Sequence, residues 1–247
     1  MRVIDLNADM GEYADDAEQA IEAALMPLIT SCSIACGGHA GNAETMRSTA
    51  RLAKAHNIKT GAHPSYPDRD GFGRRSLSLS LEELRLSLTL QVEALKGVLA
   101  MDEMLVSHVK PHGALYNDAA KDLDLARIVA AVSTGLFLVG PANSALEAAA
   151  AEAGLSFAAE GFADRLYLAS GALCPRSEPG AVIADLDARA RQALAIAKGE
   201  KICARDGECI VKADTLCIHS DSPGAVETAK AVRKTLEDAG IAIRPFA

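Results

Sequence analysis

A lysine and a histidine stand together at the end of one apolar stretch of this sequence. Residues 104–109 predict a strand, and Lys110, Pro111, His112 and Gly113 follow at once. Proline fixes one backbone angle and glycine adopts conformations that other residues resist, so the strand exit is expected to be rigid. There Lys110 could stabilise an oxyanion and His112 could act as a general acid or base. The alternative is an ordinary turn with two solvated polar side chains.

Other polar residues also come directly after stretches that predict strands. They are Asn7, Asp9, His39, His63, Glu160, Asp164, His219 and Asp221. By contrast, His56 ends a predicted helix and His108 lies inside a predicted strand. If the exits converge, their histidines and carboxylates share one pocket and can transfer protons near neutral pH. Asp9, His39 and His63 could equally form a metal site that activates water.

Strands and helices alternate along the chain, and this alternation would bring the exits together. Strands are expected at 3–6, 32–35, 58–62, 104–109, 136–140, 155–159 and 215–218. Helices are expected at 17–28, 43–56, 80–100, 123–132, 144–153, 187–198 and up to about 239, with a hairpin at 202–211 and a terminal strand at 241–246. Asn42 is a natural N-cap, and Ser80 and Glu83 have capping-box spacing. Seven βα units predict an α/β protein, a single seven-stranded parallel β/α barrel over 1–247, with functional residues at the carboxyl ends of its strands.

The loop at 65–75 is long, charged and punctuated by glycines, which is typical of a lid. Arg74 and Arg75 follow Gly71-Phe72-Gly73 in this loop. Arginine binds carboxylates and phosphates with two parallel hydrogen bonds. We therefore expect Arg74 and Arg75 to bind an anion when the lid closes; the alternative is a solvated loop.

Composition and charge exclude several classes of protein. The net charge is −8 and the basic residues are scattered, so a nucleic-acid partner is not expected. No apolar run approaches the roughly 20 residues of a membrane span, and charged residues appear early at the N-terminus, which favours a soluble, cytoplasmic protein without a membrane partner. The six cysteines form no Cys-x2-Cys pair and are expected to be buried free thiols. P-loop, dinucleotide-binding and Gly-x-Ser-x-Gly motifs are absent.

Eight segments of the sequence resemble the LamB/YcsF family, in the right order and over nearly the whole chain. They are DLNADMGE (5–12), IACGGHAG (34–41), GAHPSYPD (61–68), GFGRR (71–75), HVKPHGALYN (108–117), FADR (162–165), PRSEPGA (175–181) and HSDSPGA (219–225). The resemblance implies a barrel like that of glycoside hydrolases and deacetylases. It also implies ATP-coupled opening of the lactam ring of 5-oxo-L-proline to L-glutamate, with ATP as co-substrate, together with two other 5-oxoprolinase subunits.

The site residues expected from the motifs and the resemblance fall into two groups. The catalytic candidates are Asp9, His39, His63, Lys110 and His112. The substrate-binding candidates are Asn7, Glu12, Arg74, Arg75, Tyr116, Asp164, Arg165, Arg176 and His219. A divalent metal is an open question. Two alternatives remain: a metal-dependent deacetylase-like hydrolase acting on a carbohydrate or related amide, and a non-catalytic subunit that delivers ligand to a partner.

Overall fold

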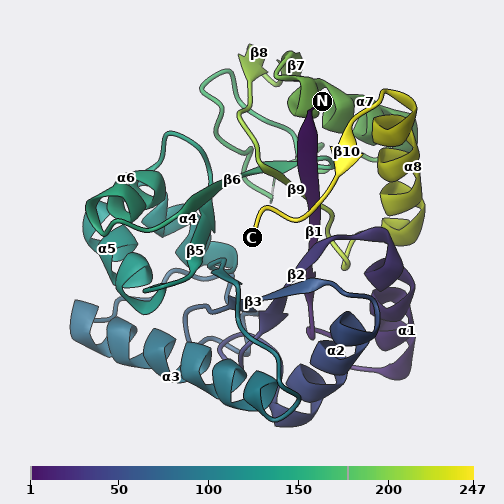
Figure 1. Cartoon of the computed structure of the whole chain (residues 1–247). Coiled ribbons are helices and arrows are strands. Elements are labelled where there is room, and N and C mark those ends of the chain that lie inside the picture. The colour runs from purple at the N-terminus through teal and green to yellow at the C-terminus, as the bar shows by residue number, and fades with distance from the viewer. Residues whose placement is uncertain (1, 177) are drawn as a thin grey trace.

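Seven parallel strands close into a barrel in this structure, a computed structural model that describes residues 2–176 and 178–247. The strands follow the order β1-β2-β3-β4-β5-β6-β9, and β9 pairs with β1 to close the ring. Helices lie around the outside of the ring (Figure 1). The predicted seven-stranded parallel β/α barrel is therefore confirmed. Ser177, which belongs to one of the quoted motifs, lies outside the described residues.

The chain alternates between barrel strands and outer helices. The barrel strands are β1 (Val3–Met10), β2 (Ser31–Ala35), β3 (Lys59–His63), β4 (His108–Val109), β5 (Phe137–Gly140), β6 (Phe157–Phe162) and β9 (Thr215–Cys217). The helices are α1 (Asp16–Leu25), η1 (Met26–Leu28, a 3-10 turn), α2 (Ala43–Ala55), α3 (Leu81–Ala100), α4 (Gly113–Ala119), α5 (Leu123–Val132), α6 (Ala145–Glu152), α7 (Leu186–Lys198) and α8 (Ala225–Asp238). The predicted hairpin is formed by β7 (Lys201–Ala204) and β8 (Gly207–Ile210), while β10 (Ala242–Ile243) pairs with the start of β1.

The side chains of β1 alternate between an apolar and a polar environment. Leu6, Ala8 and Met10 are buried in the main hydrophobic core, which also contains residues of the outer helices. Asp5 and Asn7 are buried as well, but both form hydrogen bonds with the Thr215 hydroxyl. Successive strand residues point to opposite faces, so the apolar face packs against the helices and the polar face fills the barrel.

A histidine and a glycine occupy the same level of the barrel interior. His108 is 1% exposed, and its Nε2 lies 3.1 Å from the Ser33 hydroxyl. Gly61 is in register with both residues, and a Cβ atom at position 61 would lie 2.2 Å from the His108 ring. Only glycine leaves room for this ring. Phe246 packs edge-on against His108, where the C-terminal segment crosses the opening of the ring in Figure 1.

The predicted helix caps are present. The Asn42 side chain accepts hydrogen bonds from the backbone of Glu44 and Thr45, and the Thr45 hydroxyl completes a capping box. Ser80 and Glu83 form the expected capping box at the start of α3. These local contacts satisfy backbone N–H groups that a helix start leaves without partners.

Several predicted strand boundaries are wrong. β1 continues to Met10 because its pairing with β2 extends that far, so Asp9 lies within the strand. β4 contains only two residues, and Leu105, in the segment before it, is 85% exposed. β6 runs to Phe162, which puts Glu160 inside it, and β10 is shorter than the predicted terminal strand. Helix α4, which starts at Gly113 directly after Lys110–His112, was not predicted.

Two expectations drawn from composition can be compared with the structure. None of the helices within residues 2–176 and 178–247 is long and apolar enough to cross a membrane. All six cysteines are free thiols. Five of them are buried, but Cys203 is exposed because it lies on the outer hairpin, which corrects the prediction for that residue.

Candidate active site

A cavity of about 550 Å³ collects most of the predicted site residues. The predicted residues that line it are Asp9, Glu12, His63, Arg74, Lys110, His112, Tyr116, Arg165, Arg176 and His219. They lie in the last residues of barrel strands or in the segments that follow, where a β/α barrel carries its functional groups. Four predicted residues do not line the cavity: Asn7, His39, Arg75 and Asp164.

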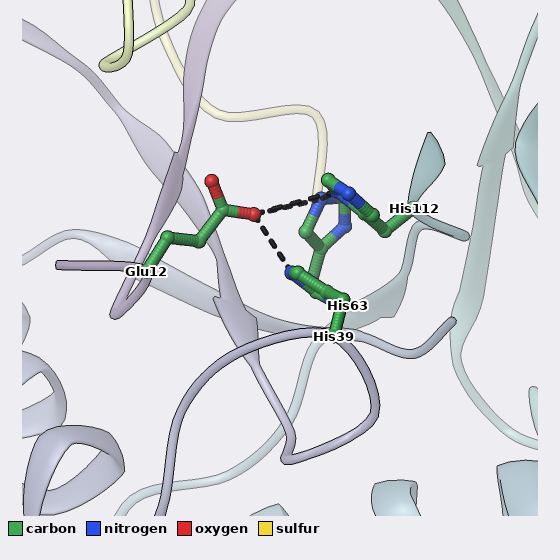
Figure 2. A group of neighbouring side chains, drawn as sticks. All are labelled: Glu12, His39, His63 and His112. Atoms are coloured by element: carbon green, nitrogen blue, oxygen red, sulfur yellow. Dashed lines mark hydrogen bonds and ion pairs between the residues drawn. The ribbon is translucent and has the colours of Figure 1, made fainter. Parts of the chain in front are cut away.

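Three histidines and one glutamate form a compact cluster on one side of this cavity. Glu12 Oε1 lies 2.8 Å from His39 Nε2, 3.4 Å from His112 Nδ1 and 3.7 Å from His63 Nε2. Figure 2 shows the three rings converging on the Glu12 carboxylate. The His39 ring stacks on that of His112, with 3.7 Å between their centroids. Residues from four separate loops and strand ends therefore meet at one point.

Backbone carbonyls determine which nitrogen carries the proton in two of these rings. His63 Nδ1 lies 2.8 Å from the carbonyl oxygen of Lys110, and His112 Nε2 lies 3.0 Å from that of Phe72. A carbonyl oxygen only accepts, so in the neutral rings these nitrogens are the donors. The other two nitrogens, His63 Nε2 and His112 Nδ1, then present lone pairs to each other 3.0 Å apart.

Burial keeps two of the rings neutral. It lowers the pKa of His39 to about 2, and the neighbouring His63 contributes in the same direction. Burial likewise lowers the pKa of His112 to about 3, again with help from the adjacent histidines. Burial also raises the pKa of Glu12. His39 and His112 are therefore neutral nitrogen bases beside a carboxyl group.

The same four residues fit a divalent metal ion. One donor atom from each of Glu12, His39, His63 and His112 lies within 4.8 Å of the others. The outer nitrogens of His63 and His112 bond to carbonyls, which is the arrangement that orients metal-binding histidines. Two facing lone pairs also repel unless a proton or a cation lies between them. This group shares His39 and His63 with the set expected from the sequence, and it contains Glu12 and His112 where that set had Asp9.

Asp9 contacts His63, with Oδ2 3.3 Å from Nε2, and is also part of a buried ion-pair network centred on Lys110. The ammonium Nζ of Lys110 lies 2.6 Å from Asp9 Oδ1 and 2.9 Å from Glu160 Oε1, and it donates to Asn7 Oδ1 at 2.9 Å. Burial opposes both charges, but the charges of His63 and Lys110 hold the pKa of Asp9 well below its usual range. The pKa of Lys110 is correspondingly raised well above its usual value, against the effect of burial, mainly by Asp9.

Glu160 was not among the predicted catalytic or substrate-binding residues, although it contacts Lys110 directly. It lies in the buried strand β6 and is 3% exposed. The signal in the sequence was a single acidic residue in the otherwise apolar segment 157–162, since a buried carboxylate needs a charged partner. Asp221 was likewise expected only at a strand exit and not as a site residue: it accepts hydrogen bonds from two arginines that line the cavity.

Charged residues from the loops after β3, β6 and β9 form the other side of the cavity. Arg176 makes a bidentate pair with Asp221, at 3.1 and 3.2 Å, and Arg74 donates to the same carboxylate at 2.7 Å. His219 Nδ1 lies 2.9 Å from Asp164. Burial would raise the pKa of Asp164, but the charge of His219 lowers it.

The structure separates the two arginines that were expected to clamp an anion together. Arg74 lines the cavity, whereas Arg75 does not. Arg75 is paired with Asp68 in its own loop, with Nε 3.0 Å from Oδ2. The two guanidinium groups thus bond to different carboxylates, Asp221 and Asp68, so they do not form the joint clamp that the sequence suggested.

Comparison with known proteins identifies similar chains over the full length. A family model described as the LamB/YcsF family matches residues 4–247. A protein from Thermus thermophilus that is named as the A subunit of 5-oxoprolinase is 44% identical, covering 98% of this chain and 99% of that protein. The protein of the same name from Bordetella pertussis is 46% identical, with 98% of each chain covered.

Solved structures give the same result for the fold. The lactam utilization protein from Thermus thermophilus superposes with a TM-score of 0.90 at 44% identity, covering 100% of both chains. A family 4 carbohydrate esterase from Streptomyces lividans superposes with a TM-score of 0.56 at 12% identity, covering 100% of this chain and 93% of the esterase. At that identity, the second similarity concerns the barrel fold alone.

Proposed function

This chain belongs to the LamB/YcsF family, and from that membership we propose that it is the A subunit of an ATP-dependent 5-oxoprolinase. In this proposal it opens the lactam of 5-oxo-L-proline to L-glutamate, as a hydrolase acting on a cyclic amide. The observation that carries the proposal is the 44–46% identity, over nearly the whole length, to proteins named as that component of 5-oxoprolinase. A cytoplasmic location and a single domain over 1–247 are parts of the same proposal.

Ring opening requires proton transfers that the histidine cluster is suited to perform. Water adds to the carbonyl carbon, the bond between that carbon and the ring nitrogen breaks, and the nitrogen gains a proton. The inward nitrogens of His63 and His112 can accept the proton from water and return it to the leaving nitrogen. Lys110, held charged by Asp9 and Glu160, provides positive charge beside the developing oxyanion.

A divalent metal is a compatible addition to this site. Glu12, His39, His63 and His112 would hold it. When bound, such an ion would act as a Lewis acid on a carbonyl oxygen and lower the pKa of water. Independently of the ion, the backbone carbonyls of Lys110 and Phe72 keep the two rings oriented toward the cavity.

We further propose that the reaction is shared with two partner subunits and uses ATP as co-substrate. A five-membered lactam is an unstrained amide, so its opening to glutamate requires coupling to ATP. Phosphorylation of the amide oxygen would activate the carbonyl carbon toward water. The relatives are named as one lettered component of a larger enzyme, which supports a complex in which this chain performs the ring opening.

The proposal is tested by mixing the purified chain with 5-oxoproline and ATP, with and without the two partner subunits, and measuring glutamate and phosphate. The expected result is no product from the chain alone and stoichiometric release of both products from the complete mixture. Product from the chain alone would refute the division of the reaction among subunits. No product from the complete mixture would refute the activity itself.

A metal-dependent deacetylase-like hydrolase remains the second candidate, because the Glu12 and histidine cluster can hold a metal ion. Elemental analysis of the purified protein and assays on acetylated sugars distinguish the two. A stoichiometric divalent ion together with ATP-independent deacetylation would favour this candidate. A bound metal ion without deacetylation, together with ATP-dependent release of glutamate, would favour the 5-oxoprolinase.

A further inference from the structure

Arg165 is held rigidly at the edge of the cavity, three residues after the end of β6. Its backbone forms an antiparallel bridge with Val182, and its carbonyl oxygen accepts a hydrogen bond from Gln192 Nε2 at 2.8 Å. The guanidinium Nη2 donates to the carbonyl oxygen of Cys174 at 2.7 Å. These contacts fix the position of the guanidinium group before any ligand binds, which lowers the entropic cost of binding.

The charge of Arg165 has no acidic partner within the described part of the chain. The residue is only 8% exposed, and its Nε is buried without a hydrogen-bond partner. None of the ion pairs among residues 2–176 and 178–247 includes it. Burial lowers the pKa of this guanidinium, and the nearby charge of Arg176 acts in the same direction. A buried charge without a counter-charge is unfavourable, so such a site favours an anion.

The nearby acidic groups are already occupied by other residues. Asp164 bonds to His219, and Glu160 bonds to Lys110. Asp221 accepts hydrogen bonds from both Arg74 and Arg176. Each of these two arginines therefore already has a carboxylate partner, which they share.

The cavity as a whole carries a small excess of positive charge in an acidic protein. Its lining includes five basic and four acidic side chains, while the whole chain has a net charge of −8. Of the basic residues without a carboxylate partner, Lys121 is exposed to solvent, whereas Arg165 is buried. The positive charge that lacks both water and a counter-ion is therefore the one on Arg165.

We propose that Arg165 binds the carboxylate of the substrate, a small cyclic amide that carries this group beside the ring nitrogen. This inference rests on the proposed function, because it takes 5-oxoproline as that substrate. β6 lies across the ring of strands from β2 and β3; His39 lies in the loop after β2, and His63 is the last residue of β3. A substrate whose carboxylate is bound to Arg165 would therefore have its lactam ring pointing across the cavity toward the histidines.

The carboxylate and its neutral carboxamide should be distinguished at this site. A carboxylate offers two acceptor oxygens to the guanidinium, whereas a carboxamide offers one acceptor and a donor group that faces other donors. The carboxamide also leaves the buried charge uncompensated. The pair 5-oxoproline and 5-oxoprolinamide thus differs only in the group that Arg165 is proposed to bind.

The test is calorimetric titration of both ligands into the assembled complex without ATP. We expect the wild-type complex to bind 5-oxoproline about 10- to 100-fold more tightly than 5-oxoprolinamide, a range typical of hydrogen bonds to charged groups. For the Arg165→Met complex, the affinities for 5-oxoproline and 5-oxoprolinamide should lie within about threefold of each other. Added guanidinium ion should restore part of the preference for 5-oxoproline. Arg75→Met, altered outside the cavity, is the matched control and should keep the wild-type preference.

Several outcomes would overturn the assignment. One is a wild-type complex that binds 5-oxoproline no more tightly than 5-oxoprolinamide, and another is an Arg165→Met complex that still prefers 5-oxoproline. A third is inorganic phosphate that competes for the site only when Arg165 is present, while the complex shows no preference for the carboxylate ligand. Arg165→Lys tests the same point if the Met variant fails to fold, because it keeps the charge and loses the planar fork. The proposed function is judged separately, by glutamate release with ATP, so the two can fail independently.

Discussion

The two sides of the cavity hold their polar groups in different ways. In the histidine wall, formed by Glu12, His39, His63 and His112, burial keeps the rings of His39 and His112 neutral, and backbone carbonyls orient the rings of His63 and His112. The arginine wall, formed by Arg165, Arg176, His219 and Asp221, comes from the loops after β6 and β9 and consists mainly of charged pairs.

This difference suggests a division of work between the walls. Neutral nitrogens with fixed lone pairs suit proton transfer or metal binding, because the ring does not have to lose a proton before it acts as a base or a ligand. Charged groups on loops suit recognition of an anionic substrate. Lys110 lies between the two walls and bonds to residues of β1 and β6.

The largest effect is expected from Lys110→Met. Removing the ammonium leaves the buried carboxylates of Asp9 and Glu160 without their partner, which should lower the free energy of unfolding by about 3–5 kcal/mol. Turnover by the complex should be lost as well. Denaturant unfolding and glutamate release measure the two effects.

Lys121→Met is the matched control, since Lys121 also lines the cavity but is exposed. Its unfolding free energy should change by less than about 0.5 kcal/mol. Near-wild-type stability of Lys110→Met would show that the network is not held together by this ion pair.

A smaller but more selective effect is expected from His112→Asn. This change removes one inward nitrogen from the histidine wall and leaves the arginine wall intact. We expect kcat to fall by about 100-fold or more, the usual contribution of a general acid or base, and KM to stay within about threefold. Steady-state kinetics of the assembled complex measure both. Unchanged kcat would support the hypothesis that this chain only delivers ligand to a partner.

The neutral state of His112 predicts a loss of stability in acid. The pKa of His112 is lowered to about 3 by burial, from the ordinary value of 6.5. Below about pH 6.5 the unfolded chain therefore binds a proton that the folded protein does not, and the free energy of unfolding falls with pH. For this one residue the loss between about pH 7.5 and about pH 5 amounts to roughly 2 kcal/mol.

The measurement compares metal-free wild type with His112→Asn at both pH values. Burial raises the pKa of Asp5 to about 6 and that of Glu22 to about 7, which acts in the opposite direction but equally in both proteins. The free energy of unfolding of the wild type, relative to that of His112→Asn, should be roughly 2 kcal/mol lower at the lower pH than at the higher pH. A constant difference would mean that His112 is protonated in the folded protein.

The smallest effect is expected from Arg75→Lys. Arg75 is paired with Asp68 outside the cavity, and lysine keeps the positive charge beside this carboxylate. Substrate affinity should change by less than about twofold, as titration of 5-oxoproline would show. A large loss of affinity would return Arg75 to the anion site that the sequence suggested.

Much of the fold could be predicted because it depends on local patterns. Asn42 and the Ser80–Glu83 pair indicated helix starts, and the alternation of strands and helices indicated the barrel. Strand ends were less predictable, because parallel pairing with a neighbour, and not composition, extends β1 to Met10.

The candidate site was predictable only as a set of residues. Their types and their positions near strand ends indicated a common pocket, but no spacing along the chain indicates which carboxylate meets which base. Glu12 therefore lies beside all three histidines, whereas Asp9 contacts His63 and is also paired with Lys110. The isolation of Arg165 depends on how every neighbouring acid is paired, and this is a property of the folded structure alone.

The division between the walls is tested most directly by titrating 5-oxoproline, side by side, into assembled complexes that carry His112→Asn or Arg165→Met. We expect wild-type affinity for His112→Asn and an affinity reduced about 10- to 100-fold for Arg165→Met. The division is contradicted if His112→Asn loses the substrate while Arg165→Met binds it as tightly as the wild type.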